Sequence, residues 1–136
     1  MTPAELRVGM EIPSLTRSIT LTDMVAYAGA TWDWHRLHYD RDWLATRGLS
    51  DPIVDGQVFG ALLAEVLQDW LGPRAVLRRL HFRFRDPVLA GETVRCGGHV
   101  SAIDGSLITV EQQVDVVGDH PRIVVAPAGA VVELTT

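Results

Sequence analysis

The chain has 136 residues, a length that favours one domain over residues 1–136 with a hydrophobic core of its own. Its 47% hydrophobic and 21% charged residues are ordinary for a globular protein, and the net charge of -5 argues against a nucleic-acid binder. The single cysteine, Cys96, excludes an internal disulfide bond, and with no signal-like leader and no apolar run of roughly 18 residues we expect a cytoplasmic protein that does not span a membrane.

The first half of the chain predicts one strand followed by helices. Residues 14–19 alternate as a strand does, and residues 22–30 repeat apolar side chains at helical spacing after a threonine that can cap the helix. Residues 41–47 predict another short helix. The longest apolar segment, residues 56–71, has one wide apolar face and ends at Gly72-Pro73. We expect this segment to be a buried central helix.

In the second half the period of the apolar pattern changes to two, which is typical of strands. Four strands are predicted, over residues 79–85, 93–102, 107–117 and 122–134. Asp104-Gly105 predicts a hairpin turn, and Pro127 and Gly129 are expected to bulge or break the last strand. This order of elements predicts an α+β fold, an antiparallel sheet wrapped around one long central helix.

One polar stretch between the helices carries candidate chemistry. Residues 33–40 read Asp-Trp-His-Arg-Leu-His-Tyr-Asp, which places two carboxylates and two imidazoles in a predicted loop or single turn. Asp33 and His38 could converge there on one water molecule or one small polar substrate. Imidazole exchanges protons near neutral pH, and a partly desolvated carboxylate beside it can share that work. On the residues alone, a capping role for Asp33 and a structural role for His38 stay open.

The order of elements and this stretch resemble the MaoC-like hydratases and dehydratases of the hot-dog fold. The signature of that family runs Asp-x-Asn-Pro-(Ile/Leu)-His-x-Asp. Four of its positions match, at Asp33, Leu37, His38 and Asp40. The Asn and Pro positions are occupied here by His35 and Arg36.

The resemblance extends over nearly the whole chain. Further matching stretches are Val8-Gly9, Asp55-Gly56 and residues 84–93. The altered signature and residues 69–73 look most like small actinobacterial subunits of the family. Some of those subunits act on steroid side-chain enoyl-CoA thioesters beside a second hot-dog subunit.

The resemblance implies hydration of trans-2-enoyl thioesters, or the reverse dehydration of (R)-3-hydroxyacyl thioesters, linked to CoA or to a carrier protein. It implies no cofactor and no metal. Asp33 and His38 would hold the water as an acid–base pair. The backbone N–H of Gly56, at the positive end of the central helix, would stabilise the enolate oxygen, with Gln57 or Val58 adjoining. The alternative is a plain glycine beside a capping Asp55.

Other residues are candidates for substrate contacts. His35 could replace the Asn of the signature as a substrate contact or lie on the surface. Arg79, His81, Arg83 and Arg85 are expected on one strand face, where Arg83 and Arg85 could bind CoA phosphates. Such a face is otherwise solvated, or paired with acids of a neighbouring strand.

Two other functions remain possible from the sequence. A hot-dog thioesterase would use a carboxylate of the central helix, where Glu65 and Asp69 are the candidates, both far from the helix start. A non-catalytic subunit would complete the acyl pocket of a partner. One helix covers only one face of a sheet and leaves its edges open, so we expect a homodimer or a hetero-oligomer with a second hot-dog subunit.

Overall fold

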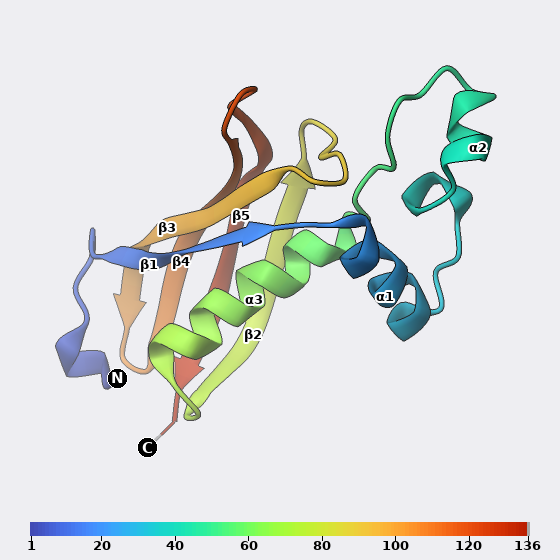
Figure 1. Cartoon of the computed structure of the whole chain (residues 1–136). Helices are drawn as coiled ribbons and strands as arrows, with labels where there is room; N and C mark the ends of the chain where they lie inside the picture. Colours follow the sequence, from blue (N-terminus) through green and yellow to red (C-terminus); the bar gives the residue numbers. More distant parts are fainter. Residues whose placement is uncertain (136) are drawn as a thin grey trace.

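The structure, a computed structural model, describes residues 1–135 and contains one antiparallel sheet of five strands (Figure 1). The strand order across the sheet is β1-β3-β4-β5-β2. The strands are β1 (Glu11–Ser18), β2 (Ala75–Phe84), β3 (Thr93–Asp104), β4 (Leu107–Val117) and β5 (Arg122–Leu134). The sheet curves around a single long helix, and this confirms the predicted α+β hot-dog arrangement.

The long helix is α3 (Gln57–Leu71), which lies across the concave face of the sheet (Figure 1). Its buried side chains recur at helical spacing and include Phe59, Leu62, Leu63, Val66 and Leu67. On the sheet side, every second residue of β4 from Ile108 to Val116 is buried, as expected for a strand with one covered face. The central helix predicted over residues 56–71 is confirmed, with Gly56 as its N-cap residue.

Register shifts interrupt the pairing of all four pairs of neighbouring strands. In β1 the shift lies between Ile12 and Leu15, where Pro13 is accommodated in an edge strand. In β2 one shift lies between Leu77 and Arg79 and another between Phe82 and Phe84, and the strand begins at Ala75 instead of residue 79. Strand β5 runs unbroken through Pro127, with a shift against β4 at that point. The proline bulges the strand and does not end it.

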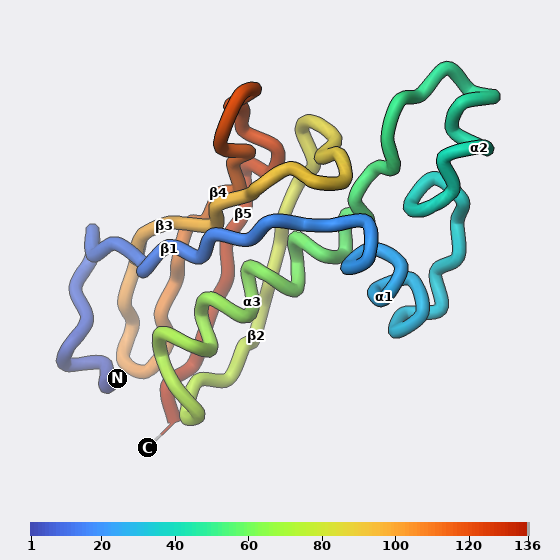
Figure 2. Tube along the Cα trace, in the orientation of Figure 1, coloured from blue at the N-terminus to red at the C-terminus, as the bar shows by residue number. Residues whose placement is uncertain are grey.

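The segment between β1 and α3 extends beyond the end of the sheet at which α3 begins (Figures 1 and 2). It contains α1 (Leu21–Thr31), the 3-10 turn η2 (Arg36–His38) and α2 (Arg41–Ala45). A capping box starts α1, because the Thr20 hydroxyl accepts from the Asp23 N–H and the Asp23 carboxylate accepts from the Thr20 N–H. No helix within residues 1–135 is long and apolar enough to cross a membrane.

Two glycines bring α3 into close contact with β2. A Cβ atom on Gly60 would lie 2.7 Å from Cζ of Phe82, and a Cβ atom on Gly56 would lie 2.7 Å from Cε1 of Phe84. The two phenylalanine rings contact each other edge to face at 5.6 Å. The Phe84 side chain is 55% exposed, because it lies over Gly56 at the N-cap of the helix instead of inside the core.

Candidate active site

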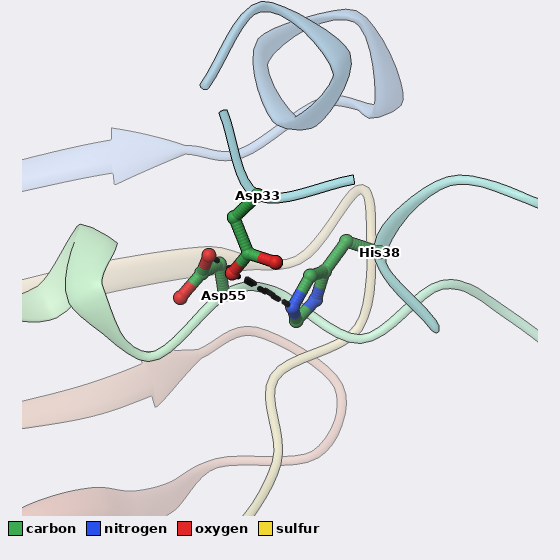
Figure 3. Close-up of side chains that lie close together, drawn as sticks. All are labelled: Asp33, His38 and Asp55. Atoms are coloured by element: carbon green, nitrogen blue, oxygen red, sulfur yellow. Dashed lines mark ion pairs between the residues drawn. The ribbon is translucent and has the colours of Figure 1, made fainter. Parts of the chain in front are cut away.

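Three side chains converge where the loop after α1, the turn η2 and the start of α3 meet (Figure 3). Nε2 of His38 lies 3.8 Å from Oδ2 of Asp33 and 3.8 Å from Oδ2 of Asp55. The Asp33 side chain is 46% exposed, whereas those of His38 and Asp55 are 14% and 13% exposed. One carboxylate of this Asp33–His38–Asp55 cluster is therefore open to solvent, and the other two groups are largely covered.

The orientation of His38 is fixed by the backbone of residue 53. Its Nδ1 lies 2.7 Å from the carbonyl oxygen of Ile53. A carbonyl oxygen only accepts hydrogen bonds, so Nδ1 carries the hydrogen and Nε2 is the atom presented to the two carboxylates. The N–H of Ile53 in turn donates to the carbonyl oxygen of Leu37 at 3.0 Å. These two bonds hold η2 against the chain that leads into α3.

Asp55 caps the start of α3 while facing His38. Its Oδ1 accepts from the N–H of Gln57 at 3.0 Å, and its backbone oxygen accepts from the N–H of Val58 at 3.0 Å. Oδ2 is thereby left to face the imidazole. The N–H groups of Gln57 and Val58 are thus both occupied, and within residues 1–135 the Gly56 N–H has no acceptor. Gly56, the predicted oxyanion donor, thus has a free N–H, whereas the adjoining Gln57 and Val58 do not.

Asp33 is positioned by the C-terminal end of α1, which it follows directly after the C-cap residue Trp32. Trp32 adopts the left-handed conformation, with φ of 57°, and the N–H of Asp33 donates to the carbonyl oxygen of Ala28 at 3.0 Å. A hydrogen bond with the Asp55 side chain, then one from the His35 N–H, holds the pKa of Asp33 below its usual range. Asp33 is consequently a carboxylate at neutral pH, suited to accept a hydrogen bond.

The spacing of the cluster lies between the spacing around one shared oxygen atom and that around a metal ion. Its three ligand-type atoms all lie within 4.8 Å of one another. Two groups that bond to one oxygen at about 2.8 Å and near-tetrahedral angles lie about 4.5 Å apart. Ligand atoms around a zinc ion at about 2.1 Å lie only about 3.4 Å apart. The two separations of 3.8 Å from Nε2 of His38 lie between these values.

The side chains of the other predicted residues lie outside this cluster, although the backbone N–H of His35 donates to Oδ1 of Asp33 at 3.4 Å. His35 is exposed, and its Nδ1 accepts from the Leu37 N–H at 3.0 Å, which makes it the cap of η2. Asp40 caps α2 through the Trp43 N–H and pairs with Arg36 at 2.9 Å.

The strand-face prediction for the arginines was wrong in part. Strand β2 ends at Phe84, so Arg85 lies just beyond the strand, although its N–H still donates to the Val124 carbonyl oxygen of β5 at 2.8 Å. Both side chains are exposed. Glu65 pairs with Arg17 at 2.7 Å, two turns along α3 from its start.

Asp55 is the member of the cluster that sequence reasoning missed. It was assigned only a capping role, which it performs. The available signal was its position directly before Gly56, the residue at which the resemblance placed the oxyanion donor. A carboxylate at that position has two oxygens, and the cap uses one of them.

A model of the MaoC-like domain family matches residues 5–120 of the chain. The beta subunit of the 3-oxo-4,17-pregnadiene-20-carboxyl-CoA hydratase of Mycobacterium tuberculosis is 33% identical over 114 residues, which are 83% of this chain and 88% of that one. An (R)-specific enoyl-CoA hydratase of Rhodospirillum rubrum is 29% identical over 82 residues, 60% of this chain and 57% of that one. The chain therefore spans most of the first relative and little more than half of the second.

Solved structures share the fold closely. A chain of the ChsH1–ChsH2 complex from Mycobacterium tuberculosis superposes with a TM-score of 0.82 and 30% identity, covering 95% of this chain and 98% of that one. The (R)-hydratase from A. caviae involved in PHA biosynthesis superposes with a TM-score of 0.86 and 26% identity, covering 96% and 98%.

Proposed function

The chain belongs to the family of MaoC-like domains, and from that premise we propose that it hydrates trans-2-enoyl thioesters or dehydrates (R)-3-hydroxyacyl thioesters. The acyl group would be carried by CoA or by an acyl-carrier protein. The observation that carries this proposal is the imidazole of His38, whose Nδ1 is anchored so that Nε2 faces Asp33 beside a free backbone N–H at the start of α3.

Each proposed group has a defined part in the reaction. During hydration the water oxygen bonds to the β-carbon, a base of the cluster takes one water proton, and the α-carbon receives a proton from an acid. The low pKa of Asp33 makes it a hydrogen-bond acceptor that orients the water, which leaves Nε2 of His38 to exchange a proton. The Gly56 N–H would donate a hydrogen bond to the thioester oxygen, on which the enolate charge develops. Dehydration follows the same steps in reverse.

Other residues contribute less directly to the proposed site. Gln57 and Val58 would contact the substrate beside Gly56. Their backbone N–H groups donate to Asp55 and so would not bind the thioester oxygen. Arg83 and Arg85 are exposed near the end of β2, whose Phe84 covers Gly56, and this position supports a contact with substrate phosphates. His35 would act by capping the turn that carries His38.

A second hot-dog subunit, identical or different, is the partner that we propose. In the described part of the chain, β1 and β2 each pair with one strand only, so both edges of the sheet offer unpaired backbone groups. The similarity to a hydratase beta subunit and to a chain of a two-protein complex supports a partner of the same fold.

The test is absorbance at the conjugated enoyl thioester band, with purified protein and crotonyl-, octenoyl- or steroid-enoyl-CoA. Loss of the band without release of free thiol is the expected result. Release of free thiol would instead indicate a thioesterase. An unchanged band with all three substrates, in the presence and in the absence of a co-expressed partner subunit, would contradict the assignment.

One observation favours a second function, that of a non-catalytic subunit. His35 and Arg36 replace the Asn and Pro of the family signature, and the related beta subunit belongs to a larger hydratase. In that case the complex would keep its activity when His38 is replaced in this chain. The intact pairing of Asp33 with His38 favours the catalytic function.

A further inference from the structure

We infer that Asp55 is a third catalytic residue, which together with Asp33 and His38 holds the reacting water at three points. The inference rests on the proposed function and names a residue to which the family signature gives no part. The inference is based on two equal distances. Oδ2 of Asp55 and Oδ2 of Asp33 each lie 3.8 Å from Nε2 of His38.

A single oxygen atom fits between the three groups. All three atoms lie within 4.8 Å of one another, a spacing that allows hydrogen bonds of about 2.8 Å to one shared oxygen. Three such contacts use three of the four hydrogen-bonding positions of a water molecule. The fourth position is the lone pair that bonds to the β-carbon. With Asp33 and His38 alone, the water would have two contacts and could still rotate about the axis that joins them.

The arrangement also fixes the number of protons. Water has two hydrogens to donate, so a third contact, with one lone pair kept for the β-carbon, must be donated by the cluster. Because Nδ1–H of His38 is bonded to Ile53, that donor would be a second proton, on Nε2 of His38. As the C–O bond forms, one water proton would pass to Asp55 and the Nε2 proton would go to the α-carbon. Each turnover adds one water to the double bond and leaves the cluster with its original proton count.

The test separates this role from the cap that Asp55 also provides. Asp55→Asn keeps an oxygen for the Gln57 N–H, since Asn caps as well as Asp, but replaces the accepting Oδ2 by a donating amide. Asp40→Asn is the matched control, because Asp40 caps α2 in the same way through the Trp43 N–H and lies outside the cluster. The measurements are kcat/KM, its pH profile and Tm.

We expect D55N to lower kcat/KM at least tenfold and to change the shape of the pH profile, with Tm close to that of the wild type. The other titratable groups in or beside the cluster are Asp33, His38, His35 and Tyr27. D40N should leave both kinetic properties unchanged. An unaltered pH profile and kcat/KM in D55N would overturn the role of Asp55 alone. Full activity in Asp33→Asn and His38→Ala would overturn the proposed site as a whole.

Discussion

At the scale of single residues, the two nitrogens of His38 have separate tasks. Nδ1 is held by a backbone carbonyl at 2.7 Å, and Nε2 faces two carboxylates. Residue 53, which supplies that carbonyl, contributes no side-chain chemistry. Residue 53 orients His38 through its backbone carbonyl, so another apolar side chain at this position should leave that orientation unchanged.

Removing either side chain of the acid–base pair should abolish most of the activity. We expect Asp33→Asn and His38→Ala each to lower kcat/KM by roughly 10²-fold or more, as is usual for lost acid–base catalysis. Steady-state kinetics on the preferred enoyl-CoA, with circular dichroism to verify folding, would measure this. A folded variant with activity within a few-fold of the wild type would contradict the assignment.

At the scale of elements, the start of α3 depends on a glycine as much as on a cap. The ring of Phe84 occupies the space that a Cβ atom on Gly56 would need. The same relation holds one turn later between Gly60 and Phe82. The helix start, with its free N–H and with Asp55 beside it, is thus positioned by β2, a strand distant in sequence.

Gly56→Ala should therefore destabilise the protein by about 1–3 kcal/mol, the usual range for overpacking. Gly97→Ala is the matched control, because a Cβ atom there meets nothing within 4 Å. Urea denaturation of both variants gives the comparison. Equal stability of the two variants would show that the Phe84 ring moves aside without cost.

The pair of Arg122 and Glu92 joins the start of β5 to the turn before β3. Both guanidinium nitrogens donate to the carboxylate, at 3.0 and 2.7 Å, and one also donates to the Pro87 carbonyl oxygen at 2.8 Å. The hydrogen bonds from Arg122 hold the pKa of Glu92 below its ordinary value of 4.5. This stabilisation is present above pH 4.5 and is lost as the pH falls through the lower folded-state pKa.

Glu92→Gln should cost about 1–2 kcal/mol of the free energy of unfolding at pH 7, the value expected for charge-assisted hydrogen bonds. The difference from the wild type should shrink as the pH falls below 4.5. Glu65→Gln removes a more exposed pair with Arg17 and should cost less than about 0.5 kcal/mol. A difference for E92Q that is constant from pH 7 to pH 3 would contradict the linkage.

At the scale of the whole molecule, the sequence predicted the order of elements and the wrapped sheet. Strands β4 and β5 match their predicted bounds, because polar and apolar residues alternate throughout β4 and apolar residues fill β5. The starts of β1 and β2 were missed where register shifts interrupt the alternation. The stretch holding Asp33 and His38 was predictable from residue types, whereas the approach of Asp55 depends on how η2 pairs with residue 53.

The core of the whole molecule can be monitored through Cys96. Its side chain is fully buried, and burial raises the pKa of its thiol to about 12. Because the thiolate is the reactive form, native protein should not react with a disulfide reagent at pH 8 and should react stoichiometrically in urea. Absorbance of the released thiol measures this. Rapid labelling of native protein would contradict the buried position.

The loop-like segment of residues 32–52 has a consequence for how the protein loses activity. Only Leu44 and Pro52 are buried there, so little apolar surface opposes its local opening. Two members of the cluster, Asp33 and His38, lie in this segment, whereas the core lies between α3 and the sheet. As the urea concentration rises, the proposed activity should therefore be lost before the sheet unfolds. Loss of activity would then report local opening of residues 32–52, whereas reaction of Cys96 would report unfolding of the core.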